Sequence, residues 1–395
     1  MKNIDLVILA GGKGSRIKQH LNNKPKPMLK FNNIYFLRYL INNYVKYPFK
    51  KIYILTGYKS DIIFKNFHNK TFNFVKIKCI KEKKALGTGG ALSKLKKEKI
   101  NDFVLANGDT IFDIDIINFI KSFKTGNIGS IALTYRKKNI NSFKLNNLGL
   151  KKKKIIYTKI NKLINGGVYF FKKKLLNLIP NKNCSLENDI LPKLIKKKVI
   201  TGNIYGDFFL DMGTPRYLKN TSSVLKKKYY RPAFFLDRDG VINYDFGYVH
   251  KIKNFKFKKG VIEGLKFLMK KNYYIFIATN QAGIAKNFFK EIDFINLHIY
   301  LKKKLSLENI FFNDVQYSPF HPKGKLKKFR KISSLRKPGN KMIINITNNW
   351  LIDKKNSFMI GDKLSDEKCA LKSKIKFNYV SDDFLKQIKR LATKN

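Results

Sequence analysis

Short apolar runs alternate with segments of helical periodicity along the first half of the chain. Runs rich in Ile, Val, Leu and Tyr are typical of buried strands, and apolar residues three and four apart indicate amphipathic helices. The expected strands are residues 5–10, 51–57, 75–80 and 102–107, and the expected helices are roughly 34–46, 60–67 and 88–97. Because the two alternate, we predict an α/β fold with a doubly wound parallel sheet, whose ligands gather at the carboxyl ends of the strands.

A second alternation of the same kind begins at residue 233. The expected strands are residues 233–236, 273–278 and 357–361, and the expected helices lie near 260–271, 288–304 and 364–373. Residues 221–232 carry polar side chains, a lysine run and a proline, and are predicted to be a linker. We therefore expect two doubly wound parallel-sheet domains, residues 1–225 and 231–390.

The charge of the chain changes the range of possible functions. Its 395 residues include 83 Lys and Arg against 26 Asp and Glu, a formal net charge of +57, and 44% are hydrophobic, which excludes a disordered polycation. Such a charge suggests nucleic acid or an anionic membrane, but only nine of the basic residues are Arg, whose fork reads phosphates and bases. We interpret the lysine excess as coding bias toward A/T-rich codons and expect no nucleic-acid partner. A lysine-rich nucleic-acid-binding protein remains the non-enzyme alternative.

The cysteines and the apolar runs bear on the compartment. Cys79, Cys184 and Cys369 stand apart, without the spacing of a zinc or disulfide framework, and suit a reducing cytoplasm. The apolar run at residues 6–10 is too short for a signal peptide, and no stretch approaches 18 uncharged apolar residues. We expect a cytoplasmic protein without a membrane partner. Nothing in the sequence predicts the oligomeric state.

A glycine-rich turn follows the first expected strand. Three glycines within four residues let backbone N–H groups close around phosphate oxygens, and Lys13 and Arg16 add positive charge. The glycines are Gly11, Gly12 and Gly14. Two prolines stiffen the segment Lys24-Pro25-Lys26-Pro27-Met28 and direct Lys26 toward the same turn.

Two further elements of the first half fit a nucleotide site. The segment Leu86–Gly90 allows close backbone approach where a helix begins, which suits a flat base or a ribose. The strand at 102–107 ends next to Asp109, where a carboxylate would hold Mg²⁺ bound to phosphates. Asp211 is a second isolated carboxylate before a glycine turn. Taken alone, each aspartate could equally be a helix or turn cap.

Six ordered motifs make residues 3–220 resemble the sugar-phosphate nucleotidylyltransferase family: LAGGKGSR, KPKPM, LGTGGA, NGDT, INGGVYFF and LDMGTP. The resemblance implies a Rossmann-like domain that joins a sugar 1-phosphate to a nucleoside triphosphate with release of pyrophosphate. It implies phosphate binding by Arg16 and Lys26 with the glycine turn, Mg²⁺ binding by Asp109 and Asp211, base binding by Glu82, Gly87 and Thr88, and sugar binding by Asn165 and Gly166. Lys159 stands where the family has a phosphate-binding lysine, without its usual Glu-Lys-Pro context. The motif sequences LGTGGA and INGGVY are most similar to those of guanylyltransferases that act on mannose- or heptose-type 1-phosphates, so GTP is the expected nucleotide.

The second half begins with two carboxylates two residues apart after a strand. Asp237 and Asp239 point to the same side and would repel each other without a cation, for which Mg²⁺ is the natural choice. One can attack phosphorus while the other exchanges a proton with the leaving alcohol. The alternative is a pair of exposed turn carboxylates. Thr279 and Asn280, which end the next strand, suit phosphate oxygens.

Further along, Lys337 supplies a fixed positive charge, Asp362 can complete the metal site and Asp366 can support it. The order DxD, Thr-Asn, Lys, GDxxxD resembles the haloacid dehalogenase phosphatases, and DRDGVIN, FGYVHKIKNFKF, TNQAGIAK and RKPG resemble the heptose 1,7-bisphosphate phosphatases, with the histidinol-phosphate phosphatases as close relatives. This resemblance, over roughly residues 233–385, implies that Asp237 is the nucleophile and Asp239 the acid/base. It further implies that Asp237, Asp362 and the Asp239 carbonyl bind Mg²⁺, and that Arg336 and Lys337 bind substrate.

Two departures from that family stand out. Members often carry a structural zinc held by four Cys and His ligands, but the corresponding positions here are Ser318, Phe320, Ser333 and Leu335. His321 alone cannot hold a structural zinc, so we predict Mg²⁺ in both domains and no zinc. Lys286 stands where the family has an arginine.

The activities implied for the two halves would be successive steps. Removal of the 7-phosphate from a heptose 1,7-bisphosphate gives a heptose 1-phosphate, which the other half would join to a nucleotide, most simply giving a GDP-heptose for a surface polysaccharide. The alternative enzyme is a mannose- or glucose-1-phosphate nucleotidylyltransferase fused to a histidinol-phosphate-like or other sugar phosphatase.

Overall fold

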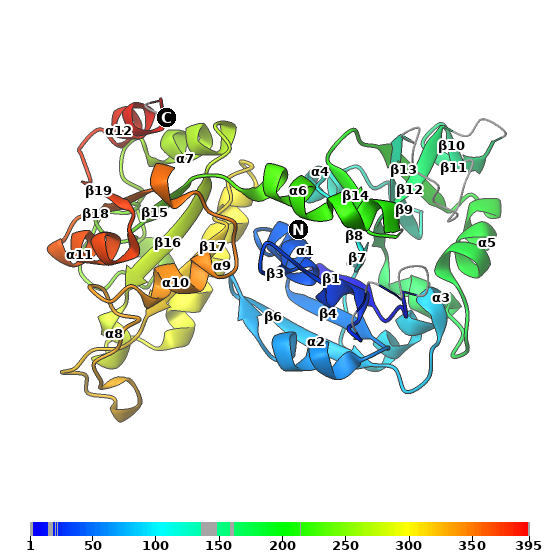
Figure 1. The fold of residues 1–395 in the computed structure, drawn as a ribbon, viewed down its shortest axis with the longest axis horizontal. Coiled ribbons are helices and arrows are strands. Elements are labelled where there is room, and N and C mark those ends of the chain that lie inside the picture. Colours follow the sequence, from blue (N-terminus) through cyan, green and yellow to red (C-terminus); the bar gives the residue numbers. More distant parts are fainter. Residues whose placement is uncertain are drawn as a thin grey trace. The chain divides into compact units, whose positions relative to one another are not determined.

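The chain folds into two compact units, each with its own sheet (Figure 1). The structure, a computed structural model, describes residues 3–14, 19, 21, 23–135, 148–158, 162–213 and 215–393, with the side chains of 215–217 set aside. The first unit comprises Met1–Tyr44 and Phe49–Ser223, and the second comprises Val45–Pro48 and Val224–Asn395. Within the described residues, no helix is long and apolar enough to cross a membrane.

Ten of the described strands of the first unit form one sheet, in the order β10-β11-β13-β9-β12-β7-β1-β4-β6-β5. Its centre is parallel: β7, β1, β4 and β6 lie side by side with matching direction. These strands are β1 (Asp5–Ala10), β4 (Lys51–Thr56), β6 (Val75–Lys81) and β7 (Phe103–Asn107). Most side chains of β1, β4 and β7 are buried, because helices cover both faces of a parallel sheet, and this explains their continuous apolar sequences. The predicted doubly wound centre is confirmed.

The rest of this sheet contains antiparallel strands that the sequence analysis did not predict. Strand β12 (Leu163–Phe171) runs antiparallel to both β7 and β9 (Gly129–Tyr135), with an irregularity between Asn165 and Val168. The other strands are β5 (Thr71–Phe72), β10 (Leu148–Lys151), β11 (Lys154–Tyr157) and β13 (Ile200–Ile204). The sheet is therefore mixed, and β12 places the residues before its irregularity beside the end of β7.

The helices of the first unit are α1 (Phe36–Val45), α2 (Ser60–Phe67), α3 (Gly87–Leu92), α4 (Ile116–Lys121) and α5 (Leu191–Lys196), with the short turns η2 (Lys26–Met28), η3 (Ser93–Lys97), η4 (Lys173–Leu178) and η5 (Leu186–Ile190). Three of these helical segments, α1, α2 and α3 with η3, agree with the expected ones, whereas α4 and α5 were not predicted. Two small sheets complete the unit: β2 (Lys30–Phe31) with β3 (Ile34–Tyr35), and β8 (Thr110–Phe112) with β14 (Phe209–Asp211). The predicted linker is largely helical, since α6 (Pro215–Tyr229) extends to Tyr229.

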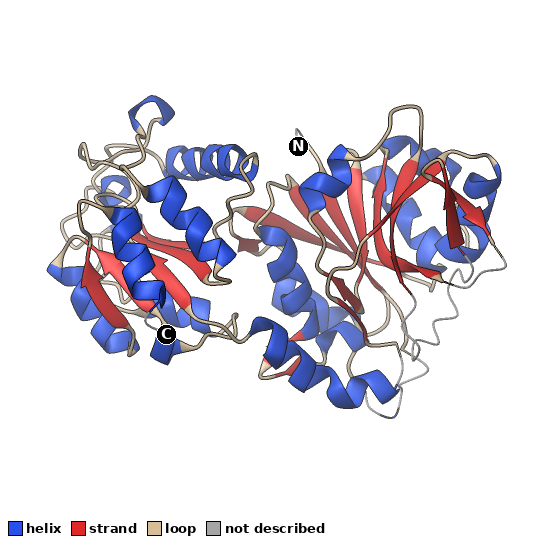
Figure 2. Cartoon of the chain, turned by 90° about the horizontal axis from the view of Figure 1, so that it is seen from above, coloured by secondary structure: helices blue, strands red, loops and turns tan. Residues whose placement is uncertain are grey.

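The second unit has a fully parallel sheet within residues 215–393, in the order β17-β16-β15-β18-β19. The strands are β15 (Ala233–Leu236), β16 (Tyr274–Asn280), β17 (Asp314–Ser318), β18 (Phe358–Gly361) and β19 (Lys376–Tyr379). The helices are α7 (Val261–Lys270), α8 (Ala282–Ala285), α9 (Glu291–Ser306), α10 (Lys341–Thr347), α11 (Leu364–Ser373) and α12 (Phe384–Thr393), with turns η6 (Ile252–Asn254), η7 (Lys327–Phe329) and η8 (Lys354–Asn356). Figure 2 shows the sheet between its helices. Phe235 and Phe276 pack on α10 and α11, and the second doubly wound sheet is confirmed.

Candidate active sites

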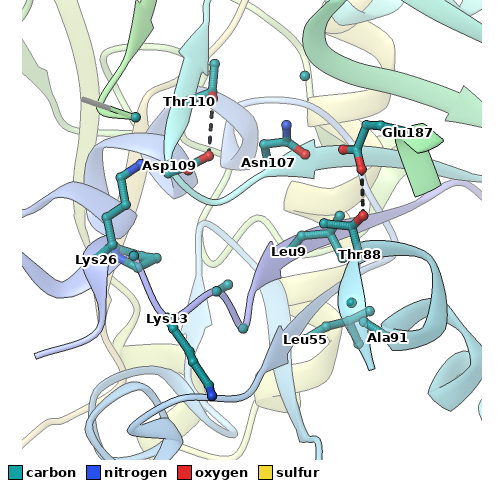
Figure 3. A pocket seen from close by; sticks show the side chains of 18 of the residues that line it. Leu9, Lys13, Lys26, Leu55, Thr88, Ala91, Asn107, Asp109, Thr110 and Glu187 are labelled. Carbon is teal, nitrogen blue, oxygen red and sulfur yellow. Dashed lines mark hydrogen bonds and ion pairs between the residues drawn. The ribbon is translucent and has the colours of Figure 1, made fainter. Parts of the chain in front are cut away.

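The first unit has a pocket of about 340 Å³ at the carboxyl ends of β1, β4 and β7 (Figure 3). Leu9, Leu55 and Asn107 contribute from the ends of these strands. The lining also includes most of the residues predicted to bind nucleotide, sugar or metal: Gly11, Gly12, Gly14, Lys26, Glu82, Gly87, Thr88, Asp109, Asn165 and Asp211. The parallel strands, together with the antiparallel strands β12 and β14, thus bring together motifs that are up to 200 residues apart in sequence. Ser15, Arg16 and Lys159 lie outside the described residues.

The glycine turn continues β1 directly into the wall of this pocket. A side chain at Gly12 would meet nothing within 4 Å, so this part of the turn opens into free space. The backbone beside it is closely packed: Gly108 N–H donates to the Leu9 carbonyl at 2.8 Å, and a Cβ at Gly108 would lie 2.5 Å from that oxygen. The arrangement leaves one face of the turn available for a ligand.

A buried lysine and two carboxylates form one end of the pocket (Figure 3). Lys26 Nζ lies 2.7 Å from Asp109 Oδ2, and the lysine side chain is only 8% exposed. Asp211 on β14 is paired with Thr110 on β8, and Thr110 directly follows Asp109 in sequence. The pairing therefore places the second carboxylate close to the first. Asp211 Oδ1 accepts the Gly213 N–H at 2.8 Å. Two neighbouring carboxylates are hard oxygen donors and fit Mg²⁺ held together with phosphate oxygens.

Glu82 is half-buried beside the glycine turn. Its Oε2 accepts the Leu86 N–H at 3.0 Å, and burial raises the pKa of this carboxyl above its ordinary value. Its Oε1 would lie 3.1 Å from a Cβ on Gly11. Gly87 has a φ of +70°, and a Cβ there would lie 2.5 Å from the Cys184 carbonyl, so only glycine fits.

The predicted sugar-binding pair needs one adjustment. Asn165 lines the pocket, donates from Nδ2 to the Tyr169 hydroxyl at 2.6 Å and accepts the Gly167 N–H at 3.0 Å. Gly166 is not among the lining residues: a Cβ on it would meet the Phe112 ring at 2.4 Å. Gly167, with a φ of +72°, lines the pocket in its place. The irregularity in β12 exposes the second glycine of the pair rather than the first.

In the second unit, Asp237 lies at the end of β15 beside a fully buried lysine. Lys337 Nζ is 2.9 Å from Asp237 Oδ2 and 2.5 Å from Asp366 Oδ1. Burial raises the pKa of Asp237, and the Lys337 charge opposes this rise. Burial would lower the pKa of Lys337, but the charges of Asp237 and Asp366 outweigh it and raise that pKa. The lysine is therefore a permanent cation between two carboxylates.

Three carboxylates of this unit form a candidate metal site. One oxygen each of Asp237, Asp362 and Asp366 lies within 4.8 Å of the others. Asp362 Oδ1 is buried without a hydrogen-bond partner in the described residues, and burial raises the pKa of Asp362. This donor set fits Mg²⁺. Asp237 and Asp362 belong to the predicted set, and Asp366, predicted only to support the site, adds a third carboxylate.

The Asp239 carboxylate is held by a buried arginine. Arg238 is 0% exposed and donates from Nη2 to both Asp239 oxygens, at 2.9 and 2.8 Å. Asn243 Nδ2 and Gln281 Nε2 each add a donor at 3.0 Å. Arg238 Nε also donates to Oδ1 at 3.1 Å, so five hydrogen bonds hold the side chain of Asp239 in position. The sequence analysis did not identify Arg238 or Gln281, although Arg238 stands between the two aspartates of the motif.

Thr279, Asn280 and Arg336 lie around the same lysine. Asn280 donates from Nδ2 to the Lys337 carbonyl at 3.1 Å and accepts the Lys337 N–H at 3.0 Å, so its side chain fixes the backbone that carries the lysine. Thr279 is buried, and its Oγ1 accepts from Gln281 Nε2 at 3.0 Å. Arg336 is half-buried and donates to the Phe320 carbonyl at 3.3 Å.

Comparison with known proteins supports both halves. The sequence model of the family described as Nucleotidyl transferase matches residues 6–228, more than half of the chain, and that described as Polynucleotide kinase 3 phosphatase matches residues 233–389. The D-glycero-beta-D-manno-heptose-1,7-bisphosphate 7-phosphatase of Haemophilus influenzae is 39% identical over 146 residues, which are 37% of this chain and 79% of that protein. The chain belongs to the nucleotidyl transferases and, in its second half, to the haloacid dehalogenase phosphatases. It is therefore an enzyme with both activities.

The chain is also similar to a second phosphatase and to a solved structure. The enzyme of the same name from Escherichia coli K12 is 39% identical over 144 residues, covering 36% of this chain and 75% of that protein. Among solved structures, HddC from Yersinia pseudotuberculosis complexed with GMP-PN is 27% identical, covers 56% of this chain and 100% of that chain, and has a TM-score of 0.49. The two family models match separate stretches, residues 6–228 and 233–389, so this chain combines the two domains.

The zinc-loop positions of this nucleotidyl transferase–phosphatase do not offer zinc ligands. Ser318 is buried at the end of β17, and Leu335 packs against the core that α10 covers. Phe320 lies against Phe329, with ring centroids 6.0 Å apart, and Ser333 Oγ accepts the Leu335 N–H at 3.2 Å. Two of the four positions are hydrocarbon and two are hydroxyl, whereas zinc takes thiolate, imidazole or carboxylate. The residues present do not fit a structural zinc.

The sequence analysis also missed Glu187 in the wall of the first pocket. This side chain is 2% exposed and lies on η5, 99 residues from the threonine that donates to it. The sequence offered little signal for it, because Glu187 stands among polar residues, between Ser185 and Asp189. Neither motif spacing nor periodicity gave it a role.

Proposed function

We propose that the chain carries out two successive steps toward a nucleotide-activated heptose. The second unit removes the 7-phosphate of a D-glycero-D-manno-heptose 1,7-bisphosphate. The first unit transfers the nucleoside monophosphate part of a nucleoside triphosphate to the heptose 1-phosphate and releases pyrophosphate. One observation carries the proposal: a half that is 39% identical to heptose-bisphosphate 7-phosphatases is fused to a nucleotidyl transferase with a formed pocket. The product of such a phosphatase is the substrate class of such a transferase.

In the phosphatase step, Asp237 is the proposed nucleophile. A carboxylate oxygen of Asp237 attacks the phosphorus, the bond to the sugar oxygen breaks, and Asp239 gives that oxygen a proton. Water then hydrolyses the aspartyl-phosphate, with Asp239 as the base. Lys337, 2.9 Å from Asp237, holds positive charge where the phosphate oxygens would lie. To reach the leaving oxygen, the Asp239 side chain must break some of its hydrogen bonds with Arg238 and Gln281.

In the transferase step, an oxygen of the sugar 1-phosphate attacks the α-phosphorus of the nucleoside triphosphate in line. No protein nucleophile is needed, so the residues contribute position and charge. Backbone N–H groups of the glycine turn and the ammonium group of Lys26 hold the phosphate oxygens, with Arg16 expected to add a second cation. Mg²⁺, when bound at the carboxylates of either unit, supplies charge that orients the phosphates and offsets their negative charge.

Guanine is the proposed base. The resemblance of the motif sequences to those of guanylyltransferases favours guanine, and Glu82 offers a physical reason for it. A carboxylate can only accept hydrogen bonds, and the edge of guanine offers N–H donors at N1 and N2, whereas adenine has an acceptor at N1. Glu82 lies beside the glycine turn at the point where a base would enter.

The direct test supplies the bisphosphate, GTP and Mg²⁺ without added zinc, and identifies the products by mass. We expect phosphate, pyrophosphate and a GDP-heptose. If only a hexose 1-phosphate reacts in the transferase assay, the sugar is wrong and the alternative of a mannose- or glucose-1-phosphate enzyme takes its place. If ATP or UTP outperforms GTP, the base is wrong. DNA binding without turnover would favour the nucleic-acid alternative.

We also place this function in the cytoplasm. Cys79, Cys184 and Cys369 are buried and free, which suits a reducing compartment, and a cytoplasmic enzyme has access to nucleoside triphosphates. A GDP-heptose made there would supply a surface polysaccharide.

A further inference from the structure

Arg238 is a buried arginine between the two aspartates of the phosphatase motif. Its guanidinium donates from Nε to Asp239 Oδ1 at 3.1 Å, and from Nη2 to Oδ1 and Oδ2 at 2.9 and 2.8 Å. The arginine is 0% exposed, whereas the Asp239 side chain is 16% exposed. A planar, forked cation fixes the orientation of a carboxylate as well as its charge. Because Arg238 is enclosed, it can act on a substrate only through the groups that it holds.

The donors to Asp239 are divided unevenly between its two oxygens. Oδ1 accepts from Arg238 Nε, Arg238 Nη2 and Asn243 Nδ2, the last at 3.0 Å. Oδ2 accepts from Arg238 Nη2 and from Gln281 Nε2 at 3.0 Å. When Oδ2 gives up its two hydrogen bonds, three donors still hold Oδ1. The carboxylate can therefore turn one oxygen toward a leaving group while the other oxygen keeps its place.

The same two donor residues also hold both ends of the loop 244–249. Asn243 Nδ2 donates to the Tyr244 carbonyl at 2.8 Å, and Arg238 Nη2 donates to the Val249 carbonyl at 2.6 Å. The exposed large side chains between these two attachments are aromatic: Tyr244, Phe246 and Tyr248. Asp239 and a loop with exposed aromatic rings are thus fixed to each other through one buried guanidinium.

The loop 244–249 borders the candidate metal site. Lys363 Nζ lies 3.7 Å from Asp245 Oδ2, in the loop, and 3.6 Å from Asp362 Oδ2, in the metal site. Oxygens of Asp362 and of the proposed nucleophile Asp237 lie within 4.8 Å of each other. We therefore expect a phosphate ester bound at Asp237 to have its alcohol part beside this loop, where Asp239 is held.

We infer that Arg238 is a positioning residue of the phosphatase: it holds Asp239 Oδ1 and the loop 244–249 as one unit, so that Oδ2 meets the oxygen of the leaving alcohol. Oδ2 gives its proton to that oxygen as the bond from the oxygen to phosphorus breaks and the bond from Asp237 to phosphorus forms. It takes a proton back from the water that hydrolyses the aspartyl-phosphate. The inference rests on the proposed phosphatase mechanism, but not on the substrate being a heptose.

The test compares two esters that differ in their need for this proton. A sugar alcohol is a poor leaving group without a proton, whereas 4-nitrophenolate leaves as a stable anion. The sugar phosphate is the one that the wild type accepts best. In Arg238→Met, made in the full chain with Mg²⁺, we expect the first-turnover rate for the sugar phosphate to fall about 100-fold or more, and that for 4-nitrophenyl phosphate to stay within about threefold.

Rapid-quench kinetics measure the first turnover, and they matter because both esters pass through the same aspartyl-phosphate. Hydrolysis of that intermediate also needs Asp239, so it should be slow in Arg238→Met whichever ester formed it. We therefore expect a burst of about one equivalent of 4-nitrophenolate, followed by slow turnover. A normal burst also shows that the variant is folded around Asp237.

Two further variants separate positioning from a merely structural role. Arg238→Lys keeps the charge but not the fork, so it should recover part of the first-turnover rate with the sugar phosphate. The matched control is Arg330→Met, which removes the same charge from the same unit. Arg330 is exposed and donates to the Lys325 carbonyl at 3.3 Å, and this variant should keep the wild-type rates with both esters.

Two results would overturn the inference. An unchanged first-turnover rate with the sugar phosphate means that Asp239 needs no help from Arg238. An equal loss with both esters means that the arginine only supports the fold. Where thermal melting shows that Arg238→Met is unfolded, the ratio of the two rates in Arg238→Lys decides in the same way.

Asp239→Asn distinguishes failure of the inference from failure of the proposed function. If this variant slows both esters equally, Asp239 is not the acid and the proposed mechanism is wrong. If it slows only the sugar phosphate while the Arg238 variants do not discriminate between the esters, the mechanism stands and only the role of Arg238 is lost. A wild type that prefers another sugar phosphate would end the heptose proposal and leave this comparison intact.

Discussion

Glu82 combines an acceptor-only side chain with a raised pKa. Replacing it by Gln should lower kcat/KM for GTP about 10- to 100-fold and narrow the preference for GTP over ATP, because an amide can also donate to the adenine acceptor. Burial raises the pKa, so the wild-type carboxylate gains a proton, and loses its acceptor, at a higher pH than an ordinary glutamate. The KM for GTP should therefore rise as the pH falls, and Glu82→Gln should lack this rise. Steady-state kinetics across pH with both nucleotides measures this, and an unchanged GTP/ATP ratio would contradict it.

Lys337 is the cation that makes a cluster of buried acids possible. Replacing it by Met leaves Asp237 and Asp366 buried without a charge partner, which costs about 3–5 kcal/mol for a buried pair. We expect phosphate release to fall at least about 100-fold and the melting temperature of the second unit to drop. Added Mg²⁺ should recover part of the stability but little of the activity. Calorimetric melting and a phosphate assay check this. The matched control is Lys363→Met, whose exposed ammonium lies 3.6 Å from Asp362 and should matter far less for stability.

Among single residues, those that belong to sequence motifs could be predicted to form the sites. Those that reach a site only through packing between distant segments could not. Asp237 and Asp362 each follow a strand end, so their meeting could be expected from the parallel order of the strands, whereas Lys337 lies in a loop and was predicted from its motif. Glu187 meets Thr88 only because two turns far apart in sequence pack together, and Gly167 replaces Gly166 only because β12 is irregular at that point. Neither the contact nor the irregularity could be predicted from the hydrophobic periodicity of the sequence.

The segment from 318 to 336 packs around a pair of phenylalanine rings. Phe329 is 8% exposed, packs against Phe320, and gives its carbonyl to the His321 N–H at 3.1 Å. We expect Phe329→Ala to destabilise this segment by about 3 kcal/mol and to lower phosphatase activity, because Arg336 and Lys337 follow it directly. Ile332→Ala, in the same segment but with its side chain 90% exposed, is the control and should change neither. Thermal melting and phosphate release measure the effect. Stoichiometric zinc in the purified protein would contradict this account.

The strands that could be predicted are those buried on both faces. A continuous apolar run such as β1 or β15 is typical of a strand at the centre of a parallel sheet, where helices bury both faces of the strand. The missed strands β9 and β12 are apolar too, but β12 contains Asn165 and two glycines, which look like a turn. The helix over the predicted linker was missed because its lysine run and serines are also typical of a loop, although lysine is a good helix former.

For the whole molecule, the net charge matters less than the placement of the few acids. A field from +57 assists capture of polyanionic phosphates and weakens with salt, but it selects no substrate. Six aspartates lie at the two sites: Asp109, Asp211, Asp237, Asp239, Asp362 and Asp366. In a chain with 26 acids, such concentration indicates sites where negative charge is kept for a purpose.

The two sites should be chemically independent although they share one chain. Asp237→Asn removes the proposed nucleophile at the end of β15, and every described residue that lines the transferase pocket lies outside the second unit. We expect no phosphate release from the bisphosphate and no GDP-heptose when the bisphosphate is the only sugar supplied. When heptose 1-phosphate is supplied instead, the same variant should form GDP-heptose at the wild-type rate. Mass detection of the nucleotide sugar under both conditions separates the steps. Loss of product under both conditions would mean that the transferase depends on the phosphatase site, and independent sites would have to be abandoned.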